Sequence, residues 1–437
     1  MLIEFFGENF GCFRDRFSLS LLATDVDPQL ERGIVEVKLK NDPKPLRLLR
    51  AIAIYGPNAS GKSTILRAAS VLHELLAATP TLASGDSLPG YEPFGGIERP
   101  PPTMLGLKAV INQEVYEYQV EFSRKRVHRE SLKLLGPSGE PSVLLDRKER
   151  STVGQWTQDR QFELISQKFR PNALLLALAD RFAPAVARNI AQAISSLTTF
   201  GAEGKTSLFG PDQPAARLAR HDAAFAQWLK RRLQSADLGV VDFNVLESEI
   251  RLPAGFLKEI QRANPELAQA MPNMSYSLQL KHGSASKPFD VDYRRESGGT
   301  KRLVQLAPML YKLAQAREPI AIYVDEIQES LHPSLLKHLL NEFNCATPMK
   351  YAQGQLIFAT HEVSLIDAPA RNAVLRRDQI YLTEKDADGA AQLYSLAEFN
   401  ERQNVNLRHR YLEGRYGAIP QLPPSTFEAG HDVNRGE

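Results

Sequence analysis

The clearest pattern along the chain is a series of short apolar runs separated by stretches in which apolar residues recur at helical spacing. The runs at 48–55, 320–324 and 355–359 are typical of strands that an α/β sheet buries on both faces. Apolar side chains at 63–78 and 303–316 recur every three or four residues, which predicts helices. We therefore expect an α/β core that combines segments from both halves of the chain.

Weaker patterns divide the rest of the chain. Aromatic or alternating runs predict strands at 2–6, 17–23, 105–122 and 141–146, and the Pro- and Gly-rich stretch 80–103 predicts a loop. Ala- and Leu-rich segments at 172–200 and 214–236 predict helices. We expect four consecutive parts: an N-terminal half of the core (1–149), a mostly helical insertion (150–275), a C-terminal half of the core (276–418) and a flexible tail (419–437).

Composition narrows the class of protein only slightly. Lys and Arg number 53 and Asp and Glu 51, which gives a net charge of +2 and no evidence for bulk attraction to nucleic acid or membranes. Cys12 and Cys345 cannot form a disulfide framework and are expected as thiols in a reducing compartment. The pattern contains no signal peptide and no apolar stretch of membrane-spanning length, so we expect a cytoplasmic protein without membrane contact.

Residues 56–64 read GPNASGKST and match the phosphate-binding pattern G-x-x-x-x-G-K-[ST] at every fixed position. Backbone N–H groups of such a loop and the N-terminus of the following helix hold phosphates. Lys62 would contact the β- and γ-phosphates of ATP, and the Ser63 hydroxyl would ligate Mg²⁺. The alternative is a glycine loop that matches the pattern by chance. Such chance matches are rare where a strand precedes the loop and a helix follows it. The predicted nucleotide-binding residues are Gly56, Pro57, Asn58, Ala59, Ser60, Gly61, Lys62, Ser63 and Thr64.

The apolar run 320–324 ends in two carboxylates, Asp325 and Glu326. In a phosphate-loop enzyme the acid at this strand end holds Mg²⁺, so Asp325 and Ser63 are the predicted metal site. Glu326 would lie beside the γ-phosphate and deprotonate the attacking water. Two ordinary surface acids are the alternative.

Two further features stand at fixed places around these acids. Ser297 lies 28 residues before Asp325 in the sequence ESGGT, at the start of a predicted helix, where small residues let the backbone approach phosphate. A simple Gly-rich helix cap is the alternative. His361 follows the run 355–359 and is suited to hydrogen bonding near neutral pH, with a structural histidine as the alternative.

The order of these motifs resembles that of the ABC and SMC ATPases. The resemblance implies an ABC-type (SMC/RecF-like) phosphate-loop ATPase head with a mostly helical insertion, which dimerises head-to-head around ATP. It makes His361 the switch histidine and aligns SLHP at 330–333 with the D-loop, although His332 replaces the usual Asp. Residues 9–13, NFGCF, are similar to the opening of SMC- and RecF-type ATPases, and Gln113 and Gln119 are candidates for the Q-loop glutamine. The residues implied to contact ATP on the other subunit are Ser297, Gly298 and Gly299.

A narrower resemblance points to a branch of this superfamily. Lys62 and Ser297 are 235 residues apart, an interval longer than that of transporter ATPases, and the heptads of an SMC arm are missing. The chain is similar to AAA-family ATPases of bacterial abortive-infection and restriction-linked operons, such as RloA-like proteins, the PARIS-system ATPase and OLD-type ATPases. The blocks that carry this similarity are GPNASGKST, ESGGTKRL, YVDEIQESLHPSL, IFATHEVSLID, LRRDQIYLTEK and LEGRYGAIP.

This resemblance implies the ATPase or sensor subunit of an anti-phage system. OLD nucleases carry a Toprim domain after the ATPase, whereas 76 residues follow His361 here. Glu384, Asp386 and Asp388 resemble an acidic metal cluster, but they lie in a KDADG turn that is typical of a solvated loop. We therefore expect no nuclease in this chain and a separate toxic effector, such as a nuclease, as its partner.

Two other hypotheses stay open. A DNA-repair or chromosome-maintenance ATPase of RecF/SMC type would act on DNA directly, and the basic clusters at 124–129 and 230–232 are its candidates if they align on one surface. A non-catalytic scaffold with a structural nucleotide is the third hypothesis, and the intact Glu326 argues against it. Arg376 and Arg377 precede a predicted strand and are candidates for supporting the site or an interface.

Overall fold

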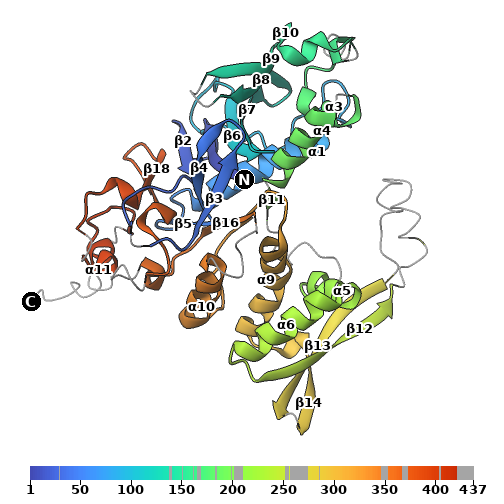
Figure 1. Cartoon of the computed structure of the whole chain (residues 1–437), viewed down its shortest axis with the longest axis vertical. Helices are drawn as coiled ribbons and strands as arrows, with labels where there is room; N and C mark the ends of the chain where they lie inside the picture. The colour runs from blue at the N-terminus through green and yellow to red at the C-terminus, as the bar shows by residue number, and fades with distance from the viewer. Residues whose placement is uncertain are drawn as a thin grey trace, which may run out of the picture.

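The computed structural model describes most of the chain up to residue 420, and Figure 1 shows how its sheets and helices are arranged. The ranges that it leaves undescribed are 29, 137–139, 150, 161, 165–168, 183–184, 198, 201–209, 251–254, 256–273, 285, 346–352, 367–372, 403–404 and 421–437. The predicted tail therefore falls almost entirely outside the described residues.

The central sheet has six strands in the order β11-β15-β16-β5-β17-β18. The first five are parallel, and β18 runs antiparallel to β17. Every residue of β5, β15 and β16 is buried, as the continuous apolar runs predict. The carboxyl ends of these parallel strands meet at one edge of the sheet, which is where ligands bind in α/β folds. The strands are β5 (Ala51–Tyr55), β11 (Thr199–Phe200), β15 (Ile320–Val324), β16 (Gly354–Ala359), β17 (Ile380–Lys385) and β18 (Ala391–Ser395).

A second, antiparallel sheet has seven strands in the order β10-β9-β8-β7-β6-β1-β2. The apolar stretch predicted as one strand at 105–122 is a hairpin, because Asn112 and Gln113 turn the chain with φ of 51° and 66°. The strands are β1 (Leu2–Glu8), β2 (Phe17–Ser20), β6 (Thr103–Ile111), β7 (Glu114–Ser123), β8 (Arg126–Leu135), β9 (Pro141–Lys148) and β10 (Ser151–Val153).

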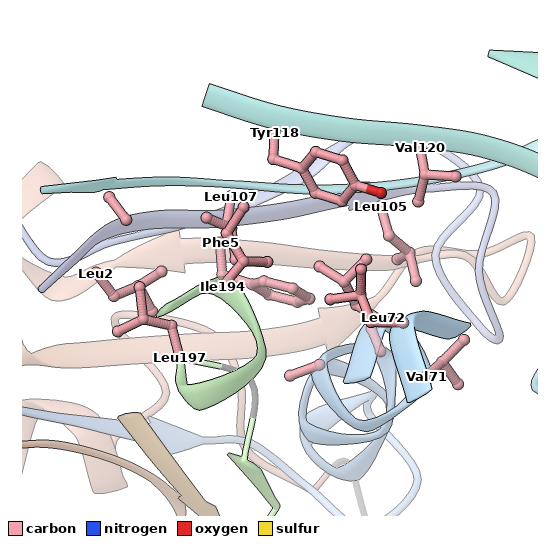
Figure 2. Packing of buried hydrophobic residues seen from close by; sticks show 14 of the residues in the cluster. Leu2, Phe5, Val71, Leu72, Leu105, Leu107, Tyr118, Val120, Ile194 and Leu197 are labelled. Carbon is pink, nitrogen blue, oxygen red and sulfur yellow. The ribbon is translucent and has the colours of Figure 1, made fainter. Parts of the chain in front are cut away.

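Helix α1 (Lys62–Ala78) lies between the two sheets and joins them into one core. Figure 2 shows Leu105 and Val120 of the antiparallel sheet above Val71 and Leu72 of α1, with Ile194 beside them. Burying each such side chain contributes roughly 1.5–3 kcal/mol. The helix that follows the phosphate loop is therefore held rigidly at the sheet edge. Helices α3 (Leu175–Phe182) and α4 (Ala185–Ser196) complete this part of the molecule.

The opposite face of the parallel sheet is covered by α9 (Gly298–Gln315) and α10 (Pro333–Asn344). Beyond α9 stands a small subdomain in which α5 (Gln213–His221) and α6 (Ala223–Ser235) pack on a three-stranded sheet (Figure 1). The predicted division at residue 275 falls within this sheet, since β12 lies before it and β13 spans it. The strands of this sheet are β12 (Val240–Glu249), β13 (Met274–Ser284) and β14 (Lys287–Asp292).

The predicted run at 48–55 is split between two sheets. Leu48 and Leu49 end β4 (Asp42–Leu49), which forms a hairpin with β3 (Ile34–Leu39), and β5 starts after Arg50. The split has a local cause, because the N–H of Arg50 donates to Gly33 O at 2.8 Å while its carbonyl accepts from Leu356 N. Further helices among the described residues include α11 (Leu407–Leu412) and the short 3-10 helices at Gln155–Gln158, Tyr293–Arg295, Val363–Ile366, Arg377–Gln379 and Leu396–Glu398.

Candidate nucleotide-binding site

The phosphate loop leaves β5 at Tyr55 and enters α1 at Lys62. Gly56 has φ of 152°, and a side chain there would meet Thr383 O at 2.4 Å, so the position requires glycine. Lys62 Nζ lies inside the loop and donates to the carbonyls of Gly56 and Pro57, each at 2.9 Å. The predicted loop therefore wraps around the ammonium of Lys62.

Two neighbouring segments fix the shape of this loop. Ser60 Oγ lies 2.6 Å from Thr383 Oγ1 on β17, and Thr383 Oγ1 also donates to Tyr55 O at 3.2 Å. Sequence reasoning gave no role to Thr383, because nothing in a single chain shows which strand pairs beside the loop. Since β17 pairs with β5, this hydroxyl reaches the loop from the adjacent strand.

The N-terminal NFGCF segment lies against the same loop and helix. Cys12 Sγ donates to Thr64 Oγ1 at 3.5 Å, and a side chain at Gly11 would meet Thr64 at 2.5 Å. Asn9 has φ of 51°, and its Oδ1 accepts from Phe94 N at 3.0 Å. This segment therefore supports the outer side of the phosphate loop by packing and hydrogen bonding.

Asp325 and Glu326 follow β15 at the same sheet edge as the phosphate loop. Asp325 Oδ1 accepts from the N–H of Glu326 at 3.1 Å, and Glu326 has φ of 44°. Burial lowers the pKa of Lys62, while the charges of Asp325 and Glu326 act in the opposite direction. The ammonium thus lies within electrostatic range of the two carboxylates.

His361 joins this group from the end of β16. Burial lowers its pKa, and the charge of Lys62 lowers it further, while Glu326 and Asp325 raise it. The neighbouring Thr360 N donates to Ile54 O at 3.1 Å, which fixes this turn beside β5. Three strands therefore bring Lys62, Asp325, Glu326 and His361 to one place, as the order of motifs predicts.

A buried arginine that sequence reasoning missed links the signature helix to the two acids. Arg302, on α9, is 3% exposed and donates through Nη2 to Asp325 O at 3.1 Å and to Glu326 O at 2.8 Å. Its Nη1 lies 3.6 Å from the Glu329 carboxylate. The guanidinium thus holds the backbone turn that carries both acids. Its signal in the sequence is an arginine inside an apolar helical stripe, at ESGGTKRL.

The Ser297 loop lies beside the turn that follows Glu326. Ser297 caps α9, since its Oγ accepts from Thr300 N at 3.2 Å, and both Ser297 and Gly298 are exposed. A side chain at Gly298 would meet Ser330 Oγ at 3.0 Å, so glycine permits this close approach. His332, which stands in place of the usual Asp, caps α10 by accepting from Ser334 N at 3.2 Å. The helix-cap role of Ser297 is therefore present, and its contact with a second copy remains a prediction.

The three-stranded sheet also reaches this loop. His282 Nε2 on β13 lies 2.7 Å from Oε1 of the buried Glu296, the residue immediately before Ser297. Tyr293 Oη donates to Lys301 O at 3.3 Å across the same turn. The small subdomain is thus tied directly to the loop that precedes α9.

The Q-loop candidates do not lie at the phosphate loop. β6 begins beside Asn9, where Thr103 Oγ1 donates to Asn9 O at 2.8 Å, and Gln113 lies in the turn at the other end of this strand. Gln119 is in the middle of β7 and donates to Glu121 at 3.0 Å. The structure gives neither glutamine a place in the site.

The acids of the KDADG turn also have local roles. Asp386 Oδ1 accepts from Asp388 N at 3.0 Å and Ala390 N at 2.8 Å, while Glu384 accepts from Ala418 N at 2.9 Å. Among the described residues, no group of three or more His, Cys, Asp or Glu side chains is arranged to hold a metal ion. Asp386 therefore stabilises its own turn, and Glu384 binds the backbone of the C-terminal segment at Ala418.

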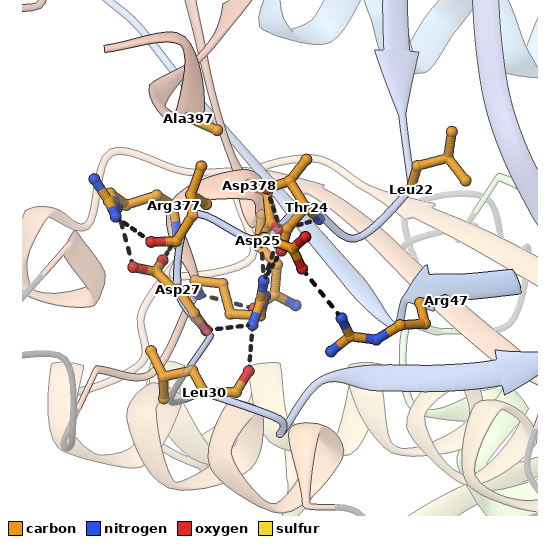
Figure 3. Close-up of polar contacts among 12 residues, drawn as sticks. Leu22, Thr24, Asp25, Asp27, Leu30, Arg47, Arg377, Asp378 and Ala397 are labelled. Carbon is orange, nitrogen blue, oxygen red and sulfur yellow. Dashed lines mark hydrogen bonds and ion pairs between the residues drawn. The ribbon is translucent and has the colours of Figure 1, made fainter. Parts of the chain in front are cut away.

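Arg376 and Arg377 support a loop remote from the phosphates. The Arg376 guanidinium forms two 2.9 Å bonds with Asp378 and donates to the carbonyls of Thr24 and Asp27. Arg377 Nε donates to Asp27 Oδ1 at 3.0 Å (Figure 3). Both side chains are at least nine-tenths buried, so they fasten the segment after β2 to the start of β17.

The site has the ligands that Mg²⁺ prefers. Ser63 is exposed in the first turn of α1, and one oxygen of Asp325 is engaged by Glu326 N, which leaves the other for a cation. Mg²⁺ favours one or two protein oxygens together with substrate phosphates and water. A hydroxyl and a single carboxylate beside a phosphate loop fit that requirement.

The fold and this edge define the class: an α/β phosphate-loop protein with a candidate nucleotide site at the carboxyl ends of its parallel strands. The model of the family described as "AAA domain, putative AbiEii toxin, Type IV TA system" matches residues 51–367. That span covers well over half of the 437 residues, so the chain belongs to this family.

Solved structures similar to the chain include two SMC heads and a RecF protein. The SMC head bound to the C-winged helix domain of ScpA shares 13% identity over 90% of this chain and 97% of its own, with a TM-score of 0.45. The SMC head domain from Thermotoga maritima has 15% identity, coverages of 90% and 98%, and a TM-score of 0.39. The recombination mediator protein RecF shares 13% identity over 90% of this chain and 98% of its own, with a TM-score of 0.36.

A comparison with curated proteins found no match. In the described part of the chain, no helix has both the length and the apolar character needed to cross a bilayer.

Proposed function

We propose that the protein binds and hydrolyses ATP with Mg²⁺ and uses this cycle as a switch. The observation that carries the proposal is the convergence of Lys62, Asp325, Glu326 and His361 at one sheet edge, supported by the lowered pKa values of Lys62 and His361. Perturbed titratable groups gathered at a binding site are typical of catalysis. The family match over 51–367 supports the same activity.

Each residue has a role that its position supports. The loop 56–63 and the start of α1 bind the phosphates, with Lys62 at the β- and γ-phosphates. Ser63 and Asp325 would hold Mg²⁺, which neutralises phosphate charge. Water attacks the γ-phosphorus, the bond to the bridging oxygen breaks, and Glu326 accepts the proton of the water. His361 hydrogen-bonds to the γ-phosphate as the sensing residue.

The proposed switch is a dimer. Ser297 and Gly298 are exposed at the positive end of an 18-residue helix, which suits them to bind the γ-phosphate held by a second copy. Two copies placed head-to-head would enclose two nucleotides, each between one phosphate loop and the Ser297 loop of the other copy. Larger homo-oligomers can be built from such dimers.

We assign this switch to bacterial defence. The family description names an AbiEii toxin and a Type IV toxin–antitoxin system, which supports the abortive-infection hypothesis. The chain would be the ATPase or sensor subunit of a cytoplasmic anti-phage system, and a separate toxic effector such as a nuclease would be its partner.

The basic clusters give less support to direct action on DNA, as a repair or chromosome ATPase would need. Lys230 pairs with Asp242 at 2.9 Å, Arg232 pairs with Glu342, and Arg129 pairs with Asp146 at 3.0 Å. Cations that carboxylates already neutralise contribute little to phosphate binding. The DNA hypothesis remains the alternative outcome of the test below.

The test is recovery of partners with tagged Glu326→Gln protein from its host, in the presence of ATP and Mg²⁺. This change keeps nucleotide binding but removes the base, so it is expected to hold the closed dimer together with its effector. The matched control combines Lys62→Ala with Glu326→Gln, which is expected to lose the partner. Recovery of DNA without a stoichiometric protein partner would overturn the defence assignment in favour of the repair hypothesis.

A further inference from the structure

The strand β3 borders a groove with one of its edges. β3 pairs with β4 on one side, and in the described ranges no other strand pairs with it. The groove has a volume of about 790 Å³ and is lined by four consecutive residues of β3, from Val35 to Lys38, and by none of β4. Successive side chains of a strand point to opposite faces. A lining of four consecutive residues therefore means that the strand edge, with its backbone N–H and C=O groups, faces the groove.

The other sides of the groove suit a peptide backbone. Asn189 and Gln192 on α4 also line the groove, as do the apolar residues Val110 and Ile111. Amide side chains both donate and accept hydrogen bonds, as a peptide group does. A strand edge beside polar and apolar side chains suits the binding of an extended segment by strand addition, in which main-chain hydrogen bonds give affinity.

The two outer edges of the β3–β4 hairpin differ in their coverage by other segments and in their proline content. The outer edge of β4 is covered by the chain after β2, since Leu49 N donates to Leu21 O at 2.7 Å and Ala23 N donates to Arg47 O at 2.9 Å. β4 also contains Pro43 and Pro45, which have no N–H to offer to an added strand. Proteins usually protect exposed strand edges with proline, charge or a covering segment. β3 carries charge at Glu36 and Lys38 but no proline, and no strand of the described residues covers this edge, so its backbone groups can accept an added strand.

The place and charge of the groove indicate its occupant. It lies at the amino ends of β15 and β16, where Glu318 and Gln353 precede these strands, and hence opposite the edge proposed to meet a second copy around ATP. Glu36 and Glu318 line it with two carboxylates, and its basic groups are the Lys38 ammonium and the α-amino group of Met1. Burial lowers the pKa of this α-amino group to about 5, so Lys38 supplies the cation at pH 7. A segment that carries Lys or Arg is therefore favoured over an acidic one.

We propose that this groove binds an extended, neutral to basic segment of a partner protein, which adds a strand to β3. The strand has six residues, so the segment pairs over a similar length. One end is closed where Lys40 N donates to Gln113 O at 2.9 Å. The inference rests on the proposed function only in naming the effector as the source of this segment.

The test uses random peptides displayed on phage and selected against the full chain, without nucleotide. Enriched sequences are expected to alternate apolar and polar residues, to lack proline and to favour Lys or Arg. The synthetic form of the strongest peptide is then measured by fluorescence anisotropy, with hydrogen exchange to locate the protected amides. Protection is expected in β3, and failure to enrich any peptide that protects β3 would overturn the proposal.

Backbone pairing is tested on the peptide itself, so that folding of a variant is not an issue. N-methylation at alternate residues is expected to weaken binding at least about tenfold in one register and little in the other. Equal effects in both registers would contradict strand addition. Glu36→Pro, which removes an N–H on the unpaired edge of β3, is expected to weaken binding similarly, and Glu36→Lys to disfavour basic peptides.

Two further outcomes separate this inference from its neighbours. Protection of β3 that rises with protein concentration in the absence of peptide would assign the groove to a second copy and overturn the partner segment. Lys62→Ala protein, which is expected to lose ATP binding, should bind the peptide as the unchanged protein does. The peptide result can therefore be interpreted even if the ATPase proposal fails.

Discussion

Buried arginines hold loops at two places in this protein: Arg302 forms the first group, and Arg376 and Arg377 form the second. The two groups differ in what the held loops carry. Arg302 grips the backbone carbonyls of Asp325 and Glu326, the two acids of the nucleotide site. Arg376 and Arg377 grip the segment around Thr24 and Asp27, which has no role in that site (Figure 3). The same chemistry, a buried guanidinium on backbone carbonyls, thus positions reacting groups in one place and only fastens the fold in the other.

The largest effect on stability is expected at the second group. Arg376→Ala leaves the buried Asp378 carboxylate without its bidentate partner, and breaking such a pair costs about 4 kcal/mol. Urea unfolding measures this loss. The matched control is Arg47→Ala, because Arg47 pairs with the exposed acids Asp25 and Glu31 and is expected to contribute less than about 1 kcal/mol. Equal losses in the two variants would remove the distinction between buried and exposed pairs.

The largest effect on turnover is expected at the first group. Arg302→Ala frees the turn that holds Glu326, and misplacing a catalytic group by about an ångström costs on the order of 100-fold in rate. Affinity for ATP is expected to change much less, because Lys62 and the phosphate loop are untouched. Steady-state phosphate release and nucleotide titration measure the two quantities.

A conservative variant sharpens this comparison. Arg302→Lys keeps a cation but lacks the planar fork that reaches two carbonyls, so partial recovery of turnover is expected. Arg376→Ala, in protein kept folded at low temperature, should retain normal turnover. If Arg376→Ala slowed turnover as much as Arg302→Ala does, the two arginine groups would not differ in the way described.

A smaller effect is expected from pH. Burial and the charge of Lys62 lower the pKa of His361 below its ordinary value of 6.5, so this side chain is neutral at pH 7. Because a lowered pKa moves protonation to more acidic solution, the contribution of His361 to turnover should stay constant from pH 8 to 7 and fall only below pH 6.5. His361→Gln is expected to lower the rate a few-fold and to abolish the fall in rate below pH 6.5, the acidic limb of the pH profile. A limb that persists unchanged in His361→Gln would assign the titration to another group.

Much of the core follows from local sequence. The runs around Ile322, Ile357 and Ile54 are apolar at every position because both sheet faces are covered, so strand type and burial were predictable. The phosphate loop was predictable because Gly56 and Lys62 are each required by local geometry. Apolar residues at helical spacing predicted a helix at 63–78, and α1 is observed at Lys62–Ala78.

The parts that sequence missed depend on contacts between distant segments. Thr383 reaches the phosphate loop only because β17 pairs with β5, and Arg302 reaches Glu326 only because α9 packs across β15. β12 mixes apolar and polar residues because its sheet buries only one face, against α5 and α6, so no continuous apolar run marks it. The edge of β3 could not be predicted either, since a strand without a second partner is defined by what the rest of the fold leaves uncovered.

The central claim is that Glu326 is the base of an ATPase, and one measurement tests it most directly. Phosphate release from ATP and Mg²⁺ would be compared for the unchanged protein, Glu326→Gln and Glu318→Gln, which makes the same change at the opposite end of β15. The account predicts a loss on the order of 100-fold in Glu326→Gln with ATP binding retained, and normal release in Glu318→Gln. Unchanged phosphate release by Glu326→Gln would contradict it.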